Sequence, residues 1–76
     1  MIPPRETLVR LMNSPAAMDL SDAEAKVMGL RLGIVSTEIL TLGRISEITG
    51  WTLATVALHE RNALTKLTEA AETEAR

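Results

Sequence analysis

The chain has 76 residues, which is enough for one domain, and its 46% hydrophobic and 24% charged residues are ordinary for a folded protein. Its formal net charge of −2 lacks the basic excess typical of a dedicated nucleic-acid binder, although it leaves room for a local basic patch. The lack of cysteine excludes disulfides and thiol chemistry, and a single histidine argues against a structural zinc site.

The sequence shows no sign of membrane insertion or export. Its apolar runs are only a few residues long, whereas a spanning helix needs about 20. The first residues, MIPPRETLVR, contain no apolar stretch of signal-peptide length. We therefore expect a cytoplasmic protein with one helical domain, residues 1–76. Its core must be aliphatic, because one Trp is the only aromatic residue.

The spacing of apolar residues predicts helices along the whole chain. In the segment PPRETLVRLM, residues 3–12, two prolines favour a helix start because a missing N–H costs nothing in the first turn. Leucines follow at helical spacing. The next residues, NSP at 13–15, predict the end of this helix, since the residue before a proline disfavours the helical conformation.

The second predicted helix has the clearest start. Ser21 and Glu24 have the spacing of a capping box, in which each side chain accepts the other residue's backbone N–H. Such a cap stabilises a helix by about 1 kcal/mol. Apolar residues continue at helical spacing to Gly33, the expected helix end. Residues 34–40, IVSTEIL, are too short and isolated for a sheet, so we expect a connection there.

Two further helices are expected to meet at a sharp turn. Thr41 is positioned to cap a short third helix, and Thr52 to cap a fourth helix that runs to Leu67. Gly50 lies between them, where a helix-turn-helix requires a tight turn. The remaining residues, 68–76, have good helix propensity, and an extension of the helix into them is one alternative. Because they are polar with nothing obvious to pack against, we expect a fraying end or short tail.

These elements predict an all-α fold, a small four-helix domain with a C-terminal helix-turn-helix. The apolar stripe that recurs along the last two helices is expected to form the core. Its residues are Ile45, Ile48, Val56, Leu64 and Leu67.

Residues 21–67 resemble a known family. AEAKVMGLRLGI is similar to the first helix of the promoter-recognition domain, region four, of bacterial housekeeping-type sigma factors. TLGRISEITGWT is similar to its turn into the recognition helix, and HERNALTKL to the end of that helix. The segments align without a gap, including the connection VSTEIL. The resemblance implies a role in transcription, since this domain reads promoter DNA in the major groove and also binds the RNA polymerase β flap, activators or anti-sigma proteins.

The sequence departs from the family where DNA reading occurs. The positions of Leu53, Ala54, Ala57 and Leu58 hold mostly Arg, Glu and Gln in the family. Arg reads guanine and Gln reads adenine through bidentate contacts, which Leu and Ala cannot make. The family also has basic residues at the positions of Asn62 and Thr65, and it often has Arg at those of Ala23 and Gly29. The first two turns of the fourth helix are therefore apolar nearly all round, as in helices buried on both sides.

The apolar surface of the fourth helix is a candidate partner-binding site. A protein partner is the leading interpretation, and cover by the first helix or direct DNA contact are the alternatives. Trp51 is either an exposed anchor for a partner or a filler in a core without Phe. The candidate partner-binding residues are Trp51, Leu53, Ala54, Ala57, Leu58 and Arg61.

A second set of residues comprises the candidates for contact with nucleic acid. Arg31 and Lys66 match basic positions of the family, and the threonine hydroxyls are suited to phosphates. Arg44 opposes the helix dipole in the first turn of its helix, which suggests a phosphate or acidic-partner contact, or none. The candidates are Arg31, Thr41, Arg44, Thr52 and Lys66.

The sequence offers no catalytic arrangement. His59 is expected to be partly buried and hydrogen-bonded, with no Ser or Asp evidently placed to pair with it. There is no Gly-rich phosphate loop, no metal-ligand spacing and no carboxylate pair with an obvious pocket. We expect a protein that is not an enzyme and that uses no cofactor, metal or small-molecule substrate.

Three functions remain open at this point. The leading hypothesis is a transcription-related interaction module, of phage or accessory origin, that binds RNA polymerase, a sigma regulator or another copy of itself. The second is a sequence-specific DNA-binding regulator with an unusual helix-turn-helix, which salt-dependent binding would reveal. The third is an oligomeric structural or assembly subunit.

Overall fold

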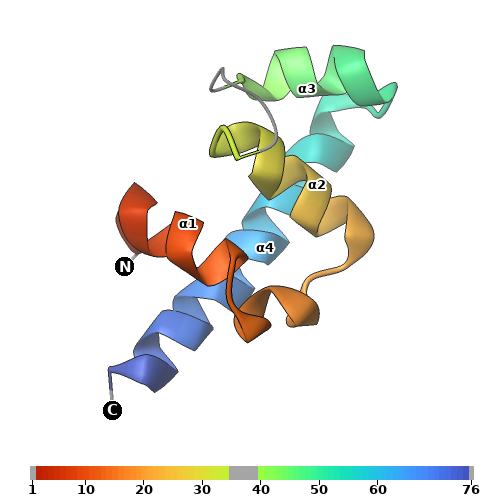
Figure 1. Cartoon of the computed structure of the whole chain (residues 1–76). Helices are drawn as coiled ribbons and strands as arrows, with labels where there is room; N and C mark the ends of the chain where they lie inside the picture. The colour runs from red at the N-terminus through yellow and green to blue at the C-terminus, as the bar shows by residue number, and fades with distance from the viewer. Residues whose placement is uncertain (1, 35–39, 76) are drawn as a thin grey trace.

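The computed structural model describes residues 2–34 and 40–75, and each regular element in these ranges is a helix (Figure 1). The predicted all-α, four-helix fold is confirmed, with a short 3-10 helix in addition. Residues 35–39, most of the predicted connection, lie outside the described residues. The elements are α1 (Arg5–Met12), η1 (Pro15–Asp19), α2 (Asp22–Arg31), α3 (Leu42–Thr49) and α4 (Leu53–Glu74).

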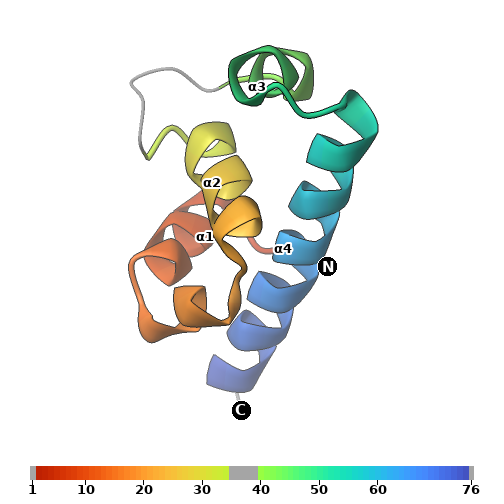
Figure 2. The same cartoon turned by 90° about the vertical axis from the view of Figure 1, so that its right-hand side faces the viewer.

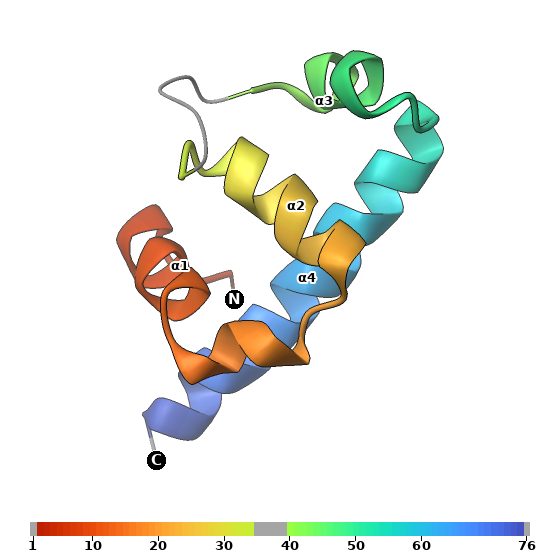
Figure 3. The ribbon, with the colours of Figure 1, turned by 45° about the vertical axis from the view of Figure 1, so that its right-hand side comes forward.

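The long helix α4 is the spine of the molecule and contacts every other helix. Figures 2 and 3 show α2 crossing its middle, with α3 at its N-terminal end and α1 and η1 beside its C-terminal half. Because α1, η1 and α2 gather on one side, the opposite side of α4 is left without a covering helix.

Local signals set the helix boundaries, as predicted. Ser21 and Glu24 form both bonds of the capping box, at 3.1 and 2.9 Å. The hydroxyls of Thr41 and Thr52 cap α3 and α4. Gly33, at φ 74°, ends α2 in a Schellman pattern, with its own N–H and the next one bonded back into the helix.

The first helix also ends where predicted, but the chain then turns once more. Asn13 is the C-cap of α1, and Ser14 caps η1 by accepting the N–H of Ala16. Pro15 occupies the first position of η1, where its missing N–H costs nothing. This turn carries Leu20 into the core, where it is 8% exposed.

The core consists of two clusters on either side of α2. The larger one joins α1, α2 and the C-terminal half of α4, and its fully buried members include Leu11 and Leu67. The smaller one joins α2, α3 and the N-terminal half of α4 through Val27, Ile45 and Val56, each 0% exposed. Val27 and its neighbour Met28 belong to different clusters, so α2 contributes side chains to both clusters and connects them.

The expectation of a fraying tail after Leu67 is wrong. Helix α4 continues without interruption to Glu74, and Ala70 and Ala71 pack against the larger core cluster. Arg10 of α1 donates two hydrogen bonds to the Glu74 carboxylate, at 2.8 and 3.2 Å. The tail has a packing partner because α1 folds back along it, which local sequence does not reveal.

One predicted core residue is also wrong. Ile45, Val56 and Leu67 are fully buried and Leu64 is half-buried, whereas Ile48 is 50% exposed. Helix α3 is only eight residues long and lies at the end of the molecule, so a single face of it meets the core. Ile48 lies one turn after Ile45 but rotated about 60° away from that face.

Candidate partner-binding surface

The turn between α3 and α4 is held by a compact set of hydrogen bonds. Gly50 adopts φ 77°, the left-handed conformation that glycine enters without strain, and its N–H bonds to the Ser46 carbonyl at 2.9 Å. The Ser46 hydroxyl donates to the Trp51 carbonyl, and the Trp51 N–H donates to the Thr49 hydroxyl at 3.2 Å. These hydrogen bonds therefore fix the turn from which the first turn of α4 begins.

Trp51 lies in the turn between α3 and α4, and its side chain fills a gap in the core more than it projects outward. The side chain is half-buried against the smaller core cluster. Its ring meets His59 edge-on, with centroids 5.4 Å apart and an interplanar angle of 61°. The ammonium of Lys26 lies 6.0 Å from the ring centroid. Of the two interpretations of Trp51, the contacts favour the core filler, and His59 is half-buried beside it.

The other apolar candidates are exposed. Leu53 is 54% and Leu58 44% exposed, and Ala54 and Ala57 are exposed beside them. We call these four residues the apolar face of α4.

The first helix does not cover the apolar face of α4. The buried leucines of α1, Leu8 and Leu11, pack in the larger cluster with Ala63 and Leu67, on the core side of α4. The alternative in which α1 folds over the face is therefore wrong, because the apolar residues of α1 are already packed against the other side of α4.

The cationic nucleic-acid candidates are each paired with a carboxylate. Arg31 bonds to Glu60 at 2.6 Å and to the Leu40 carbonyl at 2.9 Å, and its side chain is 34% exposed. Lys66 contacts Glu24 on α2 at 2.6 Å. Arg44 contacts Glu47, one turn further along α3, at 2.8 Å. The structure does not bring these three cations together into a basic patch on the outward side of α4.

The two threonine candidates are engaged as helix caps. The Thr41 hydroxyl accepts the Arg44 N–H at 3.1 Å, and the Thr52 hydroxyl accepts the Thr55 N–H at 3.2 Å. The Thr52 hydroxyl also donates to the Thr55 hydroxyl at 2.8 Å. Their hydroxyls serve to start α3 and α4, so a phosphate would compete with the caps.

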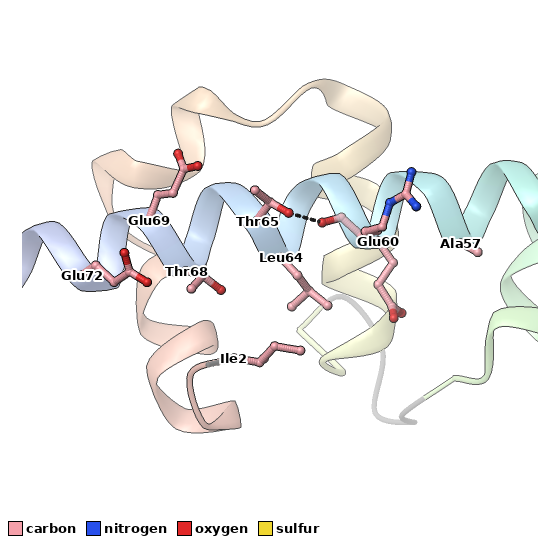
Figure 4. A pocket seen from close by; sticks show the side chains of 9 residues that line it. Ile2, Ala57, Glu60, Leu64, Thr65, Thr68, Glu69 and Glu72 are labelled. Carbon is pink, nitrogen blue, oxygen red and sulfur yellow. Dashed lines mark hydrogen bonds between the residues drawn. The ribbon is translucent and has the colours of Figure 1, made fainter.

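The last partner candidate, Arg61, lies exposed on a shallow groove of about 600 Å³ along α4. The groove runs from Ala57 to Glu72, and Ile2 from the N-terminal segment forms one wall. Figure 4 shows Ile2 beside Leu64, while Thr65 and Glu69 project from the other edge of the helix in this view. Sequence reasoning missed Ile2, because no local pattern marks it as a wall of this groove.

The buried charge of the molecule lies away from the groove. Glu24 is 6% exposed, and its hydrogen bonds with the Lys66 ammonium and the Ser21 N–H hold the pKa of its carboxyl below the ordinary value of 4.5. This pair joins α2 to α4 and anchors the helix whose outer side carries the candidate surface.

Other kinds of site find no support in residues 2–34 and 40–75. No group of three or more His, Asp or Glu side chains lies together there in a way that would hold a metal ion. None of the described helices combines the length and apolar character required to cross a membrane. Comparison with protein-family models, curated proteins and solved structures gave no match.

Proposed function

We propose that this protein is a transcription-associated interaction module, which binds RNA polymerase or a sigma regulator through the apolar face of α4. One observation carries the proposal. The first turns of the second helix in a helix-turn-helix, where a DNA reader displays polar side chains, here display Leu53 and Leu58 to solvent.

The charges support a protein partner over DNA. Most of the affinity of DNA-binding proteins comes from cations that neutralise phosphates. Arg31, Arg44 and Lys66 are each already bonded to a carboxylate. A phosphate would have to displace that carboxylate, and Leu or Ala at the base-reading positions would add at most contacts to thymine methyl groups.

The exposed residues suit a protein contact. Burying a leucine fully contributes about 1.5–3 kcal/mol, and the apolar face presents two leucines on a rigid helix. The link to transcription rests on the resemblance of residues 21–67 to sigma region four. In that family the domain binds the polymerase β flap and sigma regulators as well as DNA, so loss of DNA reading is compatible with a protein-binding role.

The test is direct binding to purified bacterial RNA polymerase and to purified sigma regulators, measured by biolayer interferometry. The wild type is compared with Leu58→Arg and Leu53→Arg. Met18→Arg is the matched control, because Met18 is 86% exposed on η1, away from α4's first turns. We expect binding that both α4 variants weaken at least about tenfold, the loss of roughly 1.4 kcal/mol, while the control binds like the wild type.

Two results would overturn the proposal. The first is no binding to either class of target. The second is equal weakening by all three variants, which would mean that the apolar face is not the contact. Retardation of promoter DNA that falls steeply with salt would favour the DNA-binding alternative instead.

A further inference from the structure

A second surface of α4 has the spacing of a helix-pairing seam. Along its outward side, exposed or half-exposed residues follow one another at intervals of three, four, three, four and three. This alternation keeps the six side chains on one stripe of α4, as in a helix face that meets a second helix, but polar or charged residues occupy four positions that a coiled coil fills with apolar ones. The seam consists of Leu58, Arg61, Thr65, Thr68, Glu72 and Ala75.

The middle of this seam coincides with the shallow groove along α4. Arg61, Thr65, Thr68 and Glu72 all line it, and the helices of the core lie on the other side of α4. Leu58 and Ala75 extend the seam at its two ends, and both are exposed. Among the described residues, no helix covers the seam, and Ile2 of the N-terminal segment borders its middle.

Charge decides what kind of helix fits. Arg61 and Glu72 are three turns apart on one stripe, about 16 Å along the axis. Neither has an ion-pair partner within residues 2–34 and 40–75, whereas Arg10, Arg31, Arg44 and Lys66 each do. Among the described residues, the seam thus has a positive charge without an ion-pair partner towards one end and a negative charge without one towards the other.

We propose that the occupant of the seam is a second copy of this chain, whose α4 lies antiparallel to the first. With the two-fold axis midway between Arg61 and Glu72, each Arg61 meets Glu72 of the second copy. Thr65 then faces Thr68 of the second copy, and Leu58 faces Ala75. Every layer joins groups of matching chemistry, and the two-fold symmetry repeats each contact.

Other arrangements of the same two helices lose this match. A parallel pair places Arg61 against Arg61 and Glu72 against Glu72, which repel. Sliding the antiparallel pair by one layer pairs Leu58 with Glu72 and Arg61 with Thr68, leaving both charges without an oppositely charged partner. The seam therefore specifies orientation and register, as charged positions do in coiled coils.

The dimer shares Leu58 with the proposed partner site, and its other contacts are independent of that site. It would cover Leu58, but Leu53 lies off the seam and Glu72 lies outside the apolar face. A charge variant at Glu72 therefore tests the dimer alone, and Leu53→Arg tests partner binding alone. The seam is short and its central layers are polar, so the dimer belongs with small, weak interfaces.

Sedimentation equilibrium of the full chain from about 10 to 500 µM covers the range of such weak association. We expect a wild-type monomer–dimer equilibrium that high salt weakens. Arg61→Glu and Glu72→Arg should each weaken it about tenfold, because each places two like-charged contacts in the dimer. The double variant R61E/E72R, which restores opposite charges, should dimerise like the wild type, and the control Arg44→Glu should not change the equilibrium.

The charge swap makes the proposal falsifiable. A wild type that remains monomeric throughout this range overturns it. So does a dimer that the single reversals leave intact, or one that the double variant fails to restore. These three charges are on exposed side chains, so circular dichroism should show the same helix content in every variant and separate lost pairing from lost folding.

Discussion

Replacing Glu24 with alanine removes one contact that caps the start of α2 and one that ties α2 to the middle of α4. The carboxylate accepts the Ser21 N–H at 2.9 Å and the Lys66 ammonium at 2.6 Å, and the residue is 6% exposed. Losing the cap costs about 1 kcal/mol, and losing a hydrogen bond to a charged group about 1.5–3 kcal/mol. Since Lys66 is 40% exposed and stays hydrated, the second figure falls towards its lower end.

We therefore expect Glu24→Ala to lower the free energy of unfolding by about 2–3 kcal/mol. That is a large share of a total stability of about 4–11 kcal/mol for a chain of this length. Urea denaturation followed by circular dichroism measures it directly. The matched control is Glu47→Ala, because Glu47 is 69% exposed in its pair with Arg44 and should cost less than about 0.5 kcal/mol. If both variants lose the same small amount, the buried pair is not an anchor and this reasoning fails.

The remaining predictions concern acid, the core, the turn and the C-terminal helix. Because folding lowers the pKa of Glu24, its carboxylate stabilises the folded state above the ordinary pKa of 4.5, and this stabilisation is lost as the pH falls through the folded pKa. The difference in unfolding free energy between the wild type and Glu24→Gln should therefore close in acid. Leu67→Ala should lower the free energy of unfolding by about 2–5 kcal/mol, and Leu53→Arg by less than about 0.5 kcal/mol. Equal urea midpoints for the two variants would contradict the assignment of Leu67 to the core. Gly50→Ala should cost about 1–2 kcal/mol, because its φ of 77° strains any side chain; a thermal melt unchanged from wild type would show that the turn relaxes. Deleting residues 69–76 should lower the unfolding midpoint, since it removes the packing of Ala70 and Ala71; unchanged stability would mean that this end of α4 is a tail after all.

The helix ends are readable from the sequence because the signals are local. Ser21, Thr41 and Thr52 each bond to a backbone N–H three residues away. The turn at Gly50 requires a left-handed backbone conformation, which glycine adopts without strain because it has no side chain. Such interactions involve only near neighbours, so they leave a recognisable pattern. The same holds for Leu58, whose helical spacing from the core stripe is enough to place it on the opposite side of α4.

Interactions between distant residues are not readable in this way. From the sequence Lys66 is available for a phosphate, yet it is bonded to Glu24, 42 positions earlier in the chain. Arg31 is available by the same criterion, yet it is bonded to Glu60, 29 positions later. A charged residue looks the same in sequence whether its partner is solvent or a carboxylate from another helix, so only the packing of α2 on α4 assigns these pairs.

By itself, the sequence determined the all-α fold, the caps and turn of the helix-turn-helix, and the apolar character of its second helix. Only the tertiary structure decided that Ile48 faces solvent, that Trp51 packs inward, and that the end of α4 is a helix held by α1. The difference is physical. Caps and periodicity depend on neighbours within about one turn, whereas burial depends on which helices lie against one another. In this chain α1 lies on the core side of α4, so no helix among the described residues covers the outward side of α4.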